Sequence, residues 1–151
     1  MTSIEVSGSV PRFSRVEIGA FVRNVLLTLE KLGRIKDGGV SEVSIAFVDD
    51  DAMRSLNRKF RHTASTTDVL TFPADDSYGD PSSNGGRPLG DIVISVDQAR
   101  RQAPAEKHSL AVEVRYLILH GILHALGYDH ETDRGEMNAL EVEVRAAVGL
   151  D

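Results

Sequence analysis

Three histidines lie close together in the segment His120-Gly-Ile-Leu-His124-Ala-Leu-Gly127-Tyr-Asp129-His130. If the first two lie on a helix, their four-residue spacing places both rings on one face, about one turn apart. Gly127 can end that helix in a left-handed conformation and turn the chain so that His130 approaches the same point. Three neutral imidazoles that converge in this way predict a divalent metal site for zinc, with a fourth position open to water.

A histidine on a buried helix can also be a hydrogen-bonded core residue, so one such residue alone would predict no function. Two rings stacked on an apolar helix, however, each need partners for both of their nitrogens. A shared metal ion satisfies one nitrogen on each ring, and a nearby hydrogen-bond acceptor satisfies the other. We therefore predict that one zinc ion is bound by His120, His124 and His130.

A second feature is a basic run, in which Arg54, Arg58, Lys59 and Arg61 lie within eight residues that contain no acid. An isolated run of this kind is ordinarily one solvated face of a helix. The formal net charge of the chain is −6, which argues mildly against a general nucleic-acid binder because such proteins are usually basic.

Composition places the chain among ordinary soluble proteins. With 151 residues and 41% hydrophobic residues, it is long enough for one domain, residues 1–151, with a substantial core. The absence of cysteine excludes disulfides and cysteine-type zinc sites. We see neither a secretory signal nor an apolar stretch that could cross a bilayer, so we expect a cytoplasmic protein without a membrane partner.

The remaining sequence indicates the elements that position these residues. Alternating or β-branched patterns predict short strands, at 5–6, 42–48, 67–72 and 90–94. Apolar residues at helical spacing, preceded by capping residues, predict helices at 15–32, 96–103 and 110–126. Two more helices are predicted, one that is capped by Asp49 or Asp50 and runs through Phe60, and one that is capped by Asp133-Arg-Gly-Glu136 and runs through Val148. The polar stretch 74–88 predicts a mobile surface loop. In the second helix we expect Met53, Leu56 and Phe60 to face inward. The pattern indicates one α+β domain: a small mixed sheet of about four strands, about five helices, and a central helix that carries the metal.

The spacing HxxxHxxGxxH resembles the zinc-binding segment of the metzincin proteases. Those enzymes place a glutamate directly after the first histidine as general base, and here that residue is Gly121. Glycine cannot accept a proton from a zinc-bound water, so we do not expect a peptidase.

The full string from His120 to His130 instead resembles the signature of the YbeY family of bacterial endoribonucleases that mature ribosomal RNA. Asn57-Arg-Lys-Phe-Arg61, followed by Thr67-Asp-Val-Leu-Thr-Phe-Pro73, is similar to the central block of that family. Leu89-Gly-Asp-Ile92 is similar to its short strand motif. The chain departs from the family at Thr66, where many members have proline, and in its long polar loop.

The resemblance implies a zincin-like fold, zinc on His120, His124 and His130, and a functional role in the cleft for Arg61. It also implies an endoribonuclease that prefers single strands and acts in small-subunit ribosomal RNA end processing and ribosome quality control. The partners it implies are ribosomal RNA, together with ribosomal proteins or ribosome-associated factors.

A guanidinium can bind a phosphate bidentately, so we hypothesise that Arg61 holds the scissile phosphate while Arg58 and Lys59 guide the RNA backbone. Asp129 is either a group that orients a ligand or accepts a proton, or a brace for the turn before His130. The attacking group stays open between zinc-bound hydroxide and the 2′-hydroxyl of the substrate. Two other functions also stay open: a ribosome-assembly factor with a mainly structural zinc, and another metal-dependent hydrolase.

Overall fold

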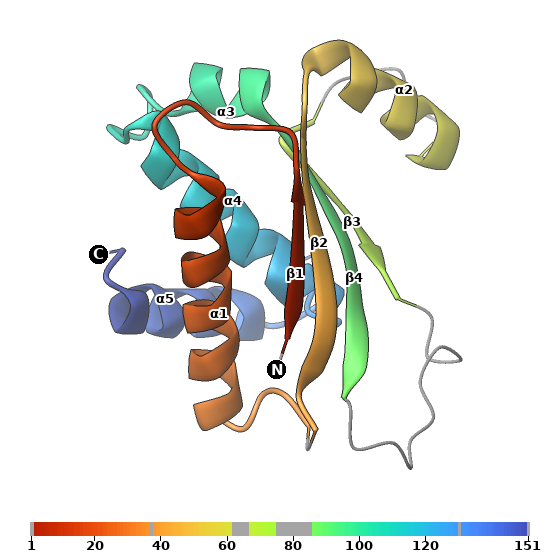
Figure 1. The fold of residues 1–151 in the computed structure, drawn as a ribbon. Coiled ribbons are helices and arrows are strands. Elements are labelled where there is room, and N and C mark those ends of the chain that lie inside the picture. Colours follow the sequence, from red (N-terminus) through yellow and green to blue (C-terminus); the bar gives the residue numbers. More distant parts are fainter. Residues whose placement is uncertain (1, 37, 62–66, 75–85, 130, 151) are drawn as a thin grey trace.

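The strands form one mixed sheet in the order β1-β2-β4-β3 (Figure 1). In this computed structural model the described residues are 2–36, 38–61, 67–74, 86–129 and 131–150. The strands are β1 (Ser3–Ser7), β2 (Val40–Val48), β3 (Val69–Pro73) and β4 (Arg87–Ser95). β1, β2 and β4 run parallel, whereas β3 pairs antiparallel with β4 and forms one edge.

Helices cover the two faces of this sheet unequally. The main core lies on one face, which carries the buried β2 residues Val43, Ile45 and Phe47. On this face α1 (Arg15–Lys31) contacts β1, and α4 (Leu110–Ala125) contacts β3 and β4. The third helix of this layer, α5 (Glu136–Val148), packs against α1 and α4 (Figure 1). On the other face, α2 (Asp50–Arg61) buries Met53 against β3 and β4. The short helix α3 (Val96–Gln102) follows β4 in the chain and precedes α4.

Local signals set the ends of the helices, as the sequence predicts. At the start of α1, the Ser14 hydroxyl accepts from the Glu17 amide, and the Glu17 carboxylate accepts from the Ser14 amide, which is the expected capping box. At the end of α4, Gly127 has a φ of 103°, its amide donates to His124, and the Tyr128 amide donates to Leu123. This is the Schellman arrangement that the glycine predicts.

The α+β class is confirmed: the described residues form a four-stranded mixed sheet and five helices. Several element boundaries differ from the prediction, and two of these differences have a clear cause. β4 already begins at Arg87, inside the stretch predicted as a loop, because Arg87 and Pro88 pair with the start of β2. α5 is capped by Gly135, although the Asp133 carboxylate still accepts from the Met137 amide in its first turn. Residues 75–85 of the predicted loop lie outside the described residues.

One prediction about packing is wrong. Phe60 does not face the interior, because 50% of its surface is exposed. The interior positions of α2 are taken by Met53 and by Asn57, which is 5% exposed, so the inner face of the helix is rotated away from Phe60.

None of the helices in the described ranges is both long enough and apolar enough to cross a membrane.

Candidate functional site

The rings of His120 and His124 meet on one face of α4, as their spacing predicts. Their Nε2 atoms lie 3.0 Å apart, and the ring planes are inclined at 71°. The helix brings the two rings to one side, because residues four apart lie on the same face of a helix. The side chain of His120 is 28% exposed, so solvent and a substrate can reach this pair.

Glu141 of α5 lies next to the other nitrogen of His120. The distance from its Oε1 to Nδ1 of His120 is 3.4 Å, and the carboxylate side chain is 18% exposed. A carboxylate beside Nδ1 favours the tautomer that carries the proton on Nδ1, which leaves the Nε2 lone pair for a ligand. α5 therefore supplies a partner that orients His120 toward His124.

These atoms fit a zinc ion. Zinc–nitrogen bonds of about 2.0–2.1 Å to both Nε2 atoms are compatible with nitrogens 3.0 Å apart. The carboxylate next to Nδ1 is the usual outer partner of a zinc-bound imidazole. Elsewhere in the described part of the chain, no third histidine or acidic residue completes a metal site with them. The predicted third ligand, His130, lies outside the described residues, so the three-ligand site stays a prediction.

Asp129 braces the segment that follows it. Its Oδ1 accepts from the Glu131 amide at 2.9 Å, and its backbone carbonyl accepts from the amides of Thr132 and Asp133. These contacts reach residues beyond position 130, so the predicted brace for the turn before His130 stays a prediction. The second predicted role of Asp129, as an orienting group or proton acceptor, stays a prediction.

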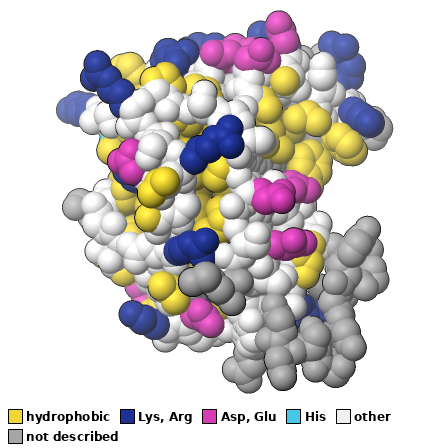
Figure 2. Space-filling model, in the orientation of Figure 1, with side chains coloured by type: hydrophobic (Ala, Val, Ile, Leu, Met, Phe, Trp, Pro, Cys, Tyr) yellow, Lys and Arg dark blue, Asp and Glu magenta, His cyan; other side chains and the backbone are white. Residues whose placement is uncertain are grey.

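The predicted RNA contacts lie on α2. Arg58 and Lys59 are exposed near its carboxyl end, and Arg61 is its last residue, with a side chain outside the described parts. Arg54, one turn before Arg58, instead forms an ion pair with Asp51 at 3.0 Å. At the end of the molecule where α2 lies, Lys or Arg side chains stand next to hydrophobic ones (Figure 2).

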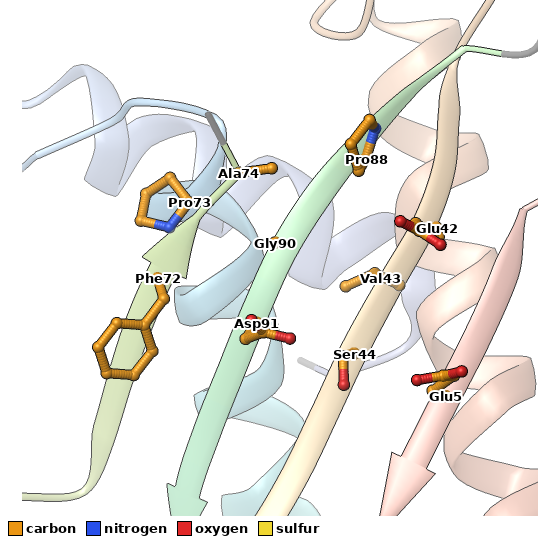
Figure 3. Close-up of a pocket in the computed structure, with 10 residues that line it drawn as sticks. All are labelled: Glu5, Glu42, Val43, Ser44, Phe72, Pro73, Ala74, Pro88, Gly90 and Asp91. Atoms are coloured by element: carbon orange, nitrogen blue, oxygen red, sulfur yellow. The ribbon is translucent and has the colours of Figure 1, made fainter. Parts of the chain in front are cut away.

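The part of the sheet that α2 leaves uncovered is an acidic groove of about 490 Å³. Glu5, Glu42 and Asp91 from three neighbouring strands lie along it, and Phe72 of β3 lies at its other side (Figure 3). The carboxylates repel phosphate groups, so this groove is the wrong place for an RNA backbone.

The structure brings His120 and His124 together but separates them from α2. The helix that carries the histidines packs on one face of the sheet, and α2 packs on the other (Figure 1). The edge strand β3 lies between the two helices. It packs against α4, and its Leu70 packs with Met53 of α2. A ligand that reaches both sets of residues must therefore pass round the β3 edge.

Sequence reasoning missed Glu141 and misplaced Phe60. Glu141 follows Leu140 in α5 and is half-buried. An acidic residue next to the apolar stripe of this helix was the only feature of the sequence that could have indicated a functional role. Nothing in the sequence relates it to His120, which lies 21 residues earlier.

Fold and site together define a small α+β protein whose central helix carries a candidate metal centre. A model of the family described as Endoribonuclease YbeY matches residues 4–149. The Endoribonuclease YbeY of Moorella thermoacetica is 47% identical over 120 residues, which cover 74% of this chain and 76% of the relative. That of Thermoanaerobacter sp. is 35% identical over an alignment of 158 positions that covers 98% of each chain.

The chain therefore belongs to the YbeY endoribonuclease family. The solution structure of TM1509 from Thermotoga maritima shares the fold, with a TM-score of 0.58 and 25% sequence identity. That match covers 96% of this chain and 88% of the other. The resemblance that the sequence motifs carry is thus confirmed at the level of family and fold.

Proposed function

We propose that this chain is a zinc-dependent endoribonuclease that cleaves single-stranded RNA during ribosomal RNA maturation in the cytoplasm. The observation that carries the proposal is the pair of Nε2 atoms 3.0 Å apart on α4, with Glu141 behind one of them, in a chain of the YbeY family. His130 is the proposed third ligand. A zinc ion held there lowers the pKa of a bound water and polarises a phosphate oxygen.

The residues of the chain have distinct proposed roles. His120 and His124 hold the metal, and Glu141 keeps His120 in the tautomer that presents Nε2. Arg61 binds the scissile phosphate through two parallel hydrogen bonds and stabilises the charge that develops on its oxygens. Arg58 and Lys59 attract the neighbouring phosphates from their exposed positions on α2. Asp129 holds the segment that follows it through the hydrogen bond from the Glu131 amide.

The arrangement of the sheet supports a single-stranded substrate. α2 and α4 pack on opposite faces, so a strand that contacts both has to bend sharply round β3. A flexible single strand can follow such a path, whereas a nucleic-acid duplex is stiff over many base pairs. We therefore expect duplex RNA to be a poor substrate.

Cleavage of a single-stranded ribosomal RNA fragment by the purified zinc-loaded protein tests the proposal. We expect His120→Ala, Arg61→Ala and chelation of the metal each to reduce the rate by at least about 100-fold. Arg54→Ala is the matched control, since Arg54 is a basic residue of the same helix that is already paired with Asp51, and we expect its rate to stay near that of the parent. Cleavage that survives in the first three samples would contradict the proposal.

The chemistry of the product ends decides how the bond is broken. A 2′,3′-cyclic phosphate would identify the ribose 2′-hydroxyl as the attacking group, and a linear phosphate would identify water. Arg61→Lys is informative in the same assay, because lysine keeps the charge but cannot bind a phosphate bidentately. A variant that cleaves as fast as the parent would remove the proposed clamp.

A second candidate is a ribosome-assembly factor whose zinc is mainly structural. The acidic groove favours it, since Glu5, Glu42 and Asp91 suit a basic protein segment better than RNA. Ribosomal proteins are therefore proposed partners. If the parent protein cleaves RNA only when ribosomal particles are present, this second function gains over the first.

A further inference from the structure

Phe60 is a large aromatic side chain that the fold leaves in contact with solvent near the end of α2. Its surface is 50% exposed, although the fully buried Met53 on the same helix shows that α2 does have an interior face. The cluster beneath α2 is formed by Met53, Leu70 and Val93 without burying Phe60. Packing of the core therefore does not account for a ring at this position.

The ring is nevertheless held in place. It meets Phe72 of β3 in an edge-to-face contact, with centroids 5.1 Å apart and planes inclined at 71°. Phe72 itself packs against the cluster beneath α2. A ring that is fixed at one side and exposed at the other loses little conformational freedom when a second flat group packs on it.

One positive charge lies against this ring. The Lys59 ammonium lies over the Phe60 ring, 5.2 Å from its centroid, and Arg58 is exposed two residues earlier on the same helix. An exposed aromatic ring beside a cation can bind single-stranded nucleic acid, because a base stacks on the ring while the cation attracts a phosphate.

We propose that Phe60 is a stacking platform for one unpaired base of the RNA strand, with Lys59 attracting a neighbouring phosphate. The inference rests on the proposed RNA substrate and identifies a residue that distinguishes single-stranded RNA from a duplex. In a duplex both faces of each base are covered by neighbouring bases, so only an unpaired base can stack on the ring. Phe60 contacts β3, the edge round which the strand must pass to reach His120 and His124.

The absence of tryptophan from the chain allows a direct test. Phe60→Trp creates a protein with a single indole at the proposed platform, and Val16→Trp places the indole at an 82% exposed position on α1 as the matched control. The ligand is a single-stranded oligonucleotide with 2′-O-methyl riboses, whose binding is measured separately by anisotropy of an attached dye. For the Phe60→Trp protein we expect saturable quenching of the indole fluorescence by the single strand and little quenching by the matching duplex. For the Val16→Trp protein we expect no specific change with either ligand.

Two further variants separate stacking from general apolar contact. Phe60→Leu keeps an apolar side chain without an aromatic face, whereas Phe60→Tyr keeps the face. We expect Phe60→Leu to weaken binding of the single strand by roughly 5- to 100-fold, and Phe60→Tyr to bind within about twofold of the parent. Thermal unfolding of both variants checks that the fold is intact, and Arg54→Ala serves again as the control for charge on α2.

The two ways in which the test can fail are distinguishable. If the oligonucleotide binds by anisotropy but the indole of the Phe60→Trp protein is not quenched, or if Phe60→Leu binds as well as the parent, the stacking role is wrong while RNA binding stands. An apolar protein segment would then be the better occupant of this ring. If the parent does not bind the oligonucleotide at all, the proposed function fails and the stacking role with it.

Discussion

Gly121 of α4 lies so close to Ile92 of β4 that a Cβ atom on the glycine would stand 2.6 Å from Cγ2 of Ile92. Ile92 is fully buried, so it has no free space into which to move. The position that carries the general-base glutamate in HExxH peptidases therefore faces the sheet in this protein. A glutamate at this position would therefore meet the sheet and could not point toward a metal on the histidine face of α4.

We predict that Gly121→Ala destabilises the protein although alanine favours helix more than glycine does. The steric overlap with Ile92 costs more than the gain in helix propensity, and we expect a net loss of about 1–2 kcal/mol. Gly19→Ala is the control: it lies inside α1 with no atom within 4 Å of the new Cβ, and should stabilise by about 0.5–1 kcal/mol. Urea unfolding measures both, and a Gly121→Ala protein as stable as the parent would contradict the close contact.

We predict that Glu141→Ala weakens zinc binding about 10- to 100-fold, because His120 loses the carboxylate that orients its ring. Competition with a chromophoric chelator measures the affinity without reference to RNA cleavage. Glu143→Ala, an exposed acid on the same helix, controls for the loss of a negative charge and should leave the affinity within about twofold. Equal affinities for the two variants would show that Glu141 has no role in the metal centre.

Charged contacts hold the start of α2 to α3. Arg101 donates two hydrogen bonds to Asp50, of 2.7 and 2.8 Å, and the Asp50 amide donates to Asp97 at 3.0 Å. Hydrogen bonding to Asp50 raises the pKa of Arg101 above its usual value, so the guanidinium stays charged across the working pH range. This contact connects α3 to the helix that carries Arg58 and Lys59.

We expect Arg101→Ala to lower the urea midpoint by roughly 0.2–0.5 M, since bidentate geometry makes this pair stronger than most exposed ones. Arg100→Ala removes the longer ion pair with Asp97, at 3.6 Å, and should change the midpoint by less. The exchanged pair Asp50→Arg with Arg101→Asp should recover part of the lost stability. Indistinguishable midpoints for the two single variants would contradict the proposed anchor.

The capping box of α1 should make stability depend on pH in the acid range. The Ser14 amide, and next its hydroxyl, form hydrogen bonds with Glu17 that lower the pKa of this carboxyl below its ordinary value of 4.5. The unfolded chain therefore takes up the proton at a higher pH than the folded one does. The resulting stabilisation is complete above the ordinary pKa and is lost as the pH falls through the lowered one.

The comparison of the parent with Glu17→Gln isolates this effect. We expect a melting temperature about 1–2 °C lower for the variant at pH 7, and a difference that shrinks toward zero as the solution is acidified below pH 4.5. In a Ser14→Ala background, which keeps the backbone amide but removes the hydroxyl, the pH-dependent part of the difference should become smaller without disappearing. A difference that stays constant with pH would mean that Glu17 acts without its charge.

Local periodicity was enough to determine much of this protein. The four-residue spacing of His120 and His124, the glycine after α4 and the Ser14 capping box each act over one or two turns of chain, so the sequence predicts them directly. The alternating strands and apolar helix faces likewise determine the α+β class. The family signature depends on the same short motifs.

Contacts between distant elements were decided only when the elements packed. The sequence does not fix the rotation of α5 that brings Glu141 to His120, nor the approach of α4 to β4 that requires glycine at Gly121. The pairing of Asp50 with Arg101 spans 51 residues. The exposure of Phe60 follows from how α2 lies on the sheet. A small rotation of a helix about its axis buries one residue and exposes another.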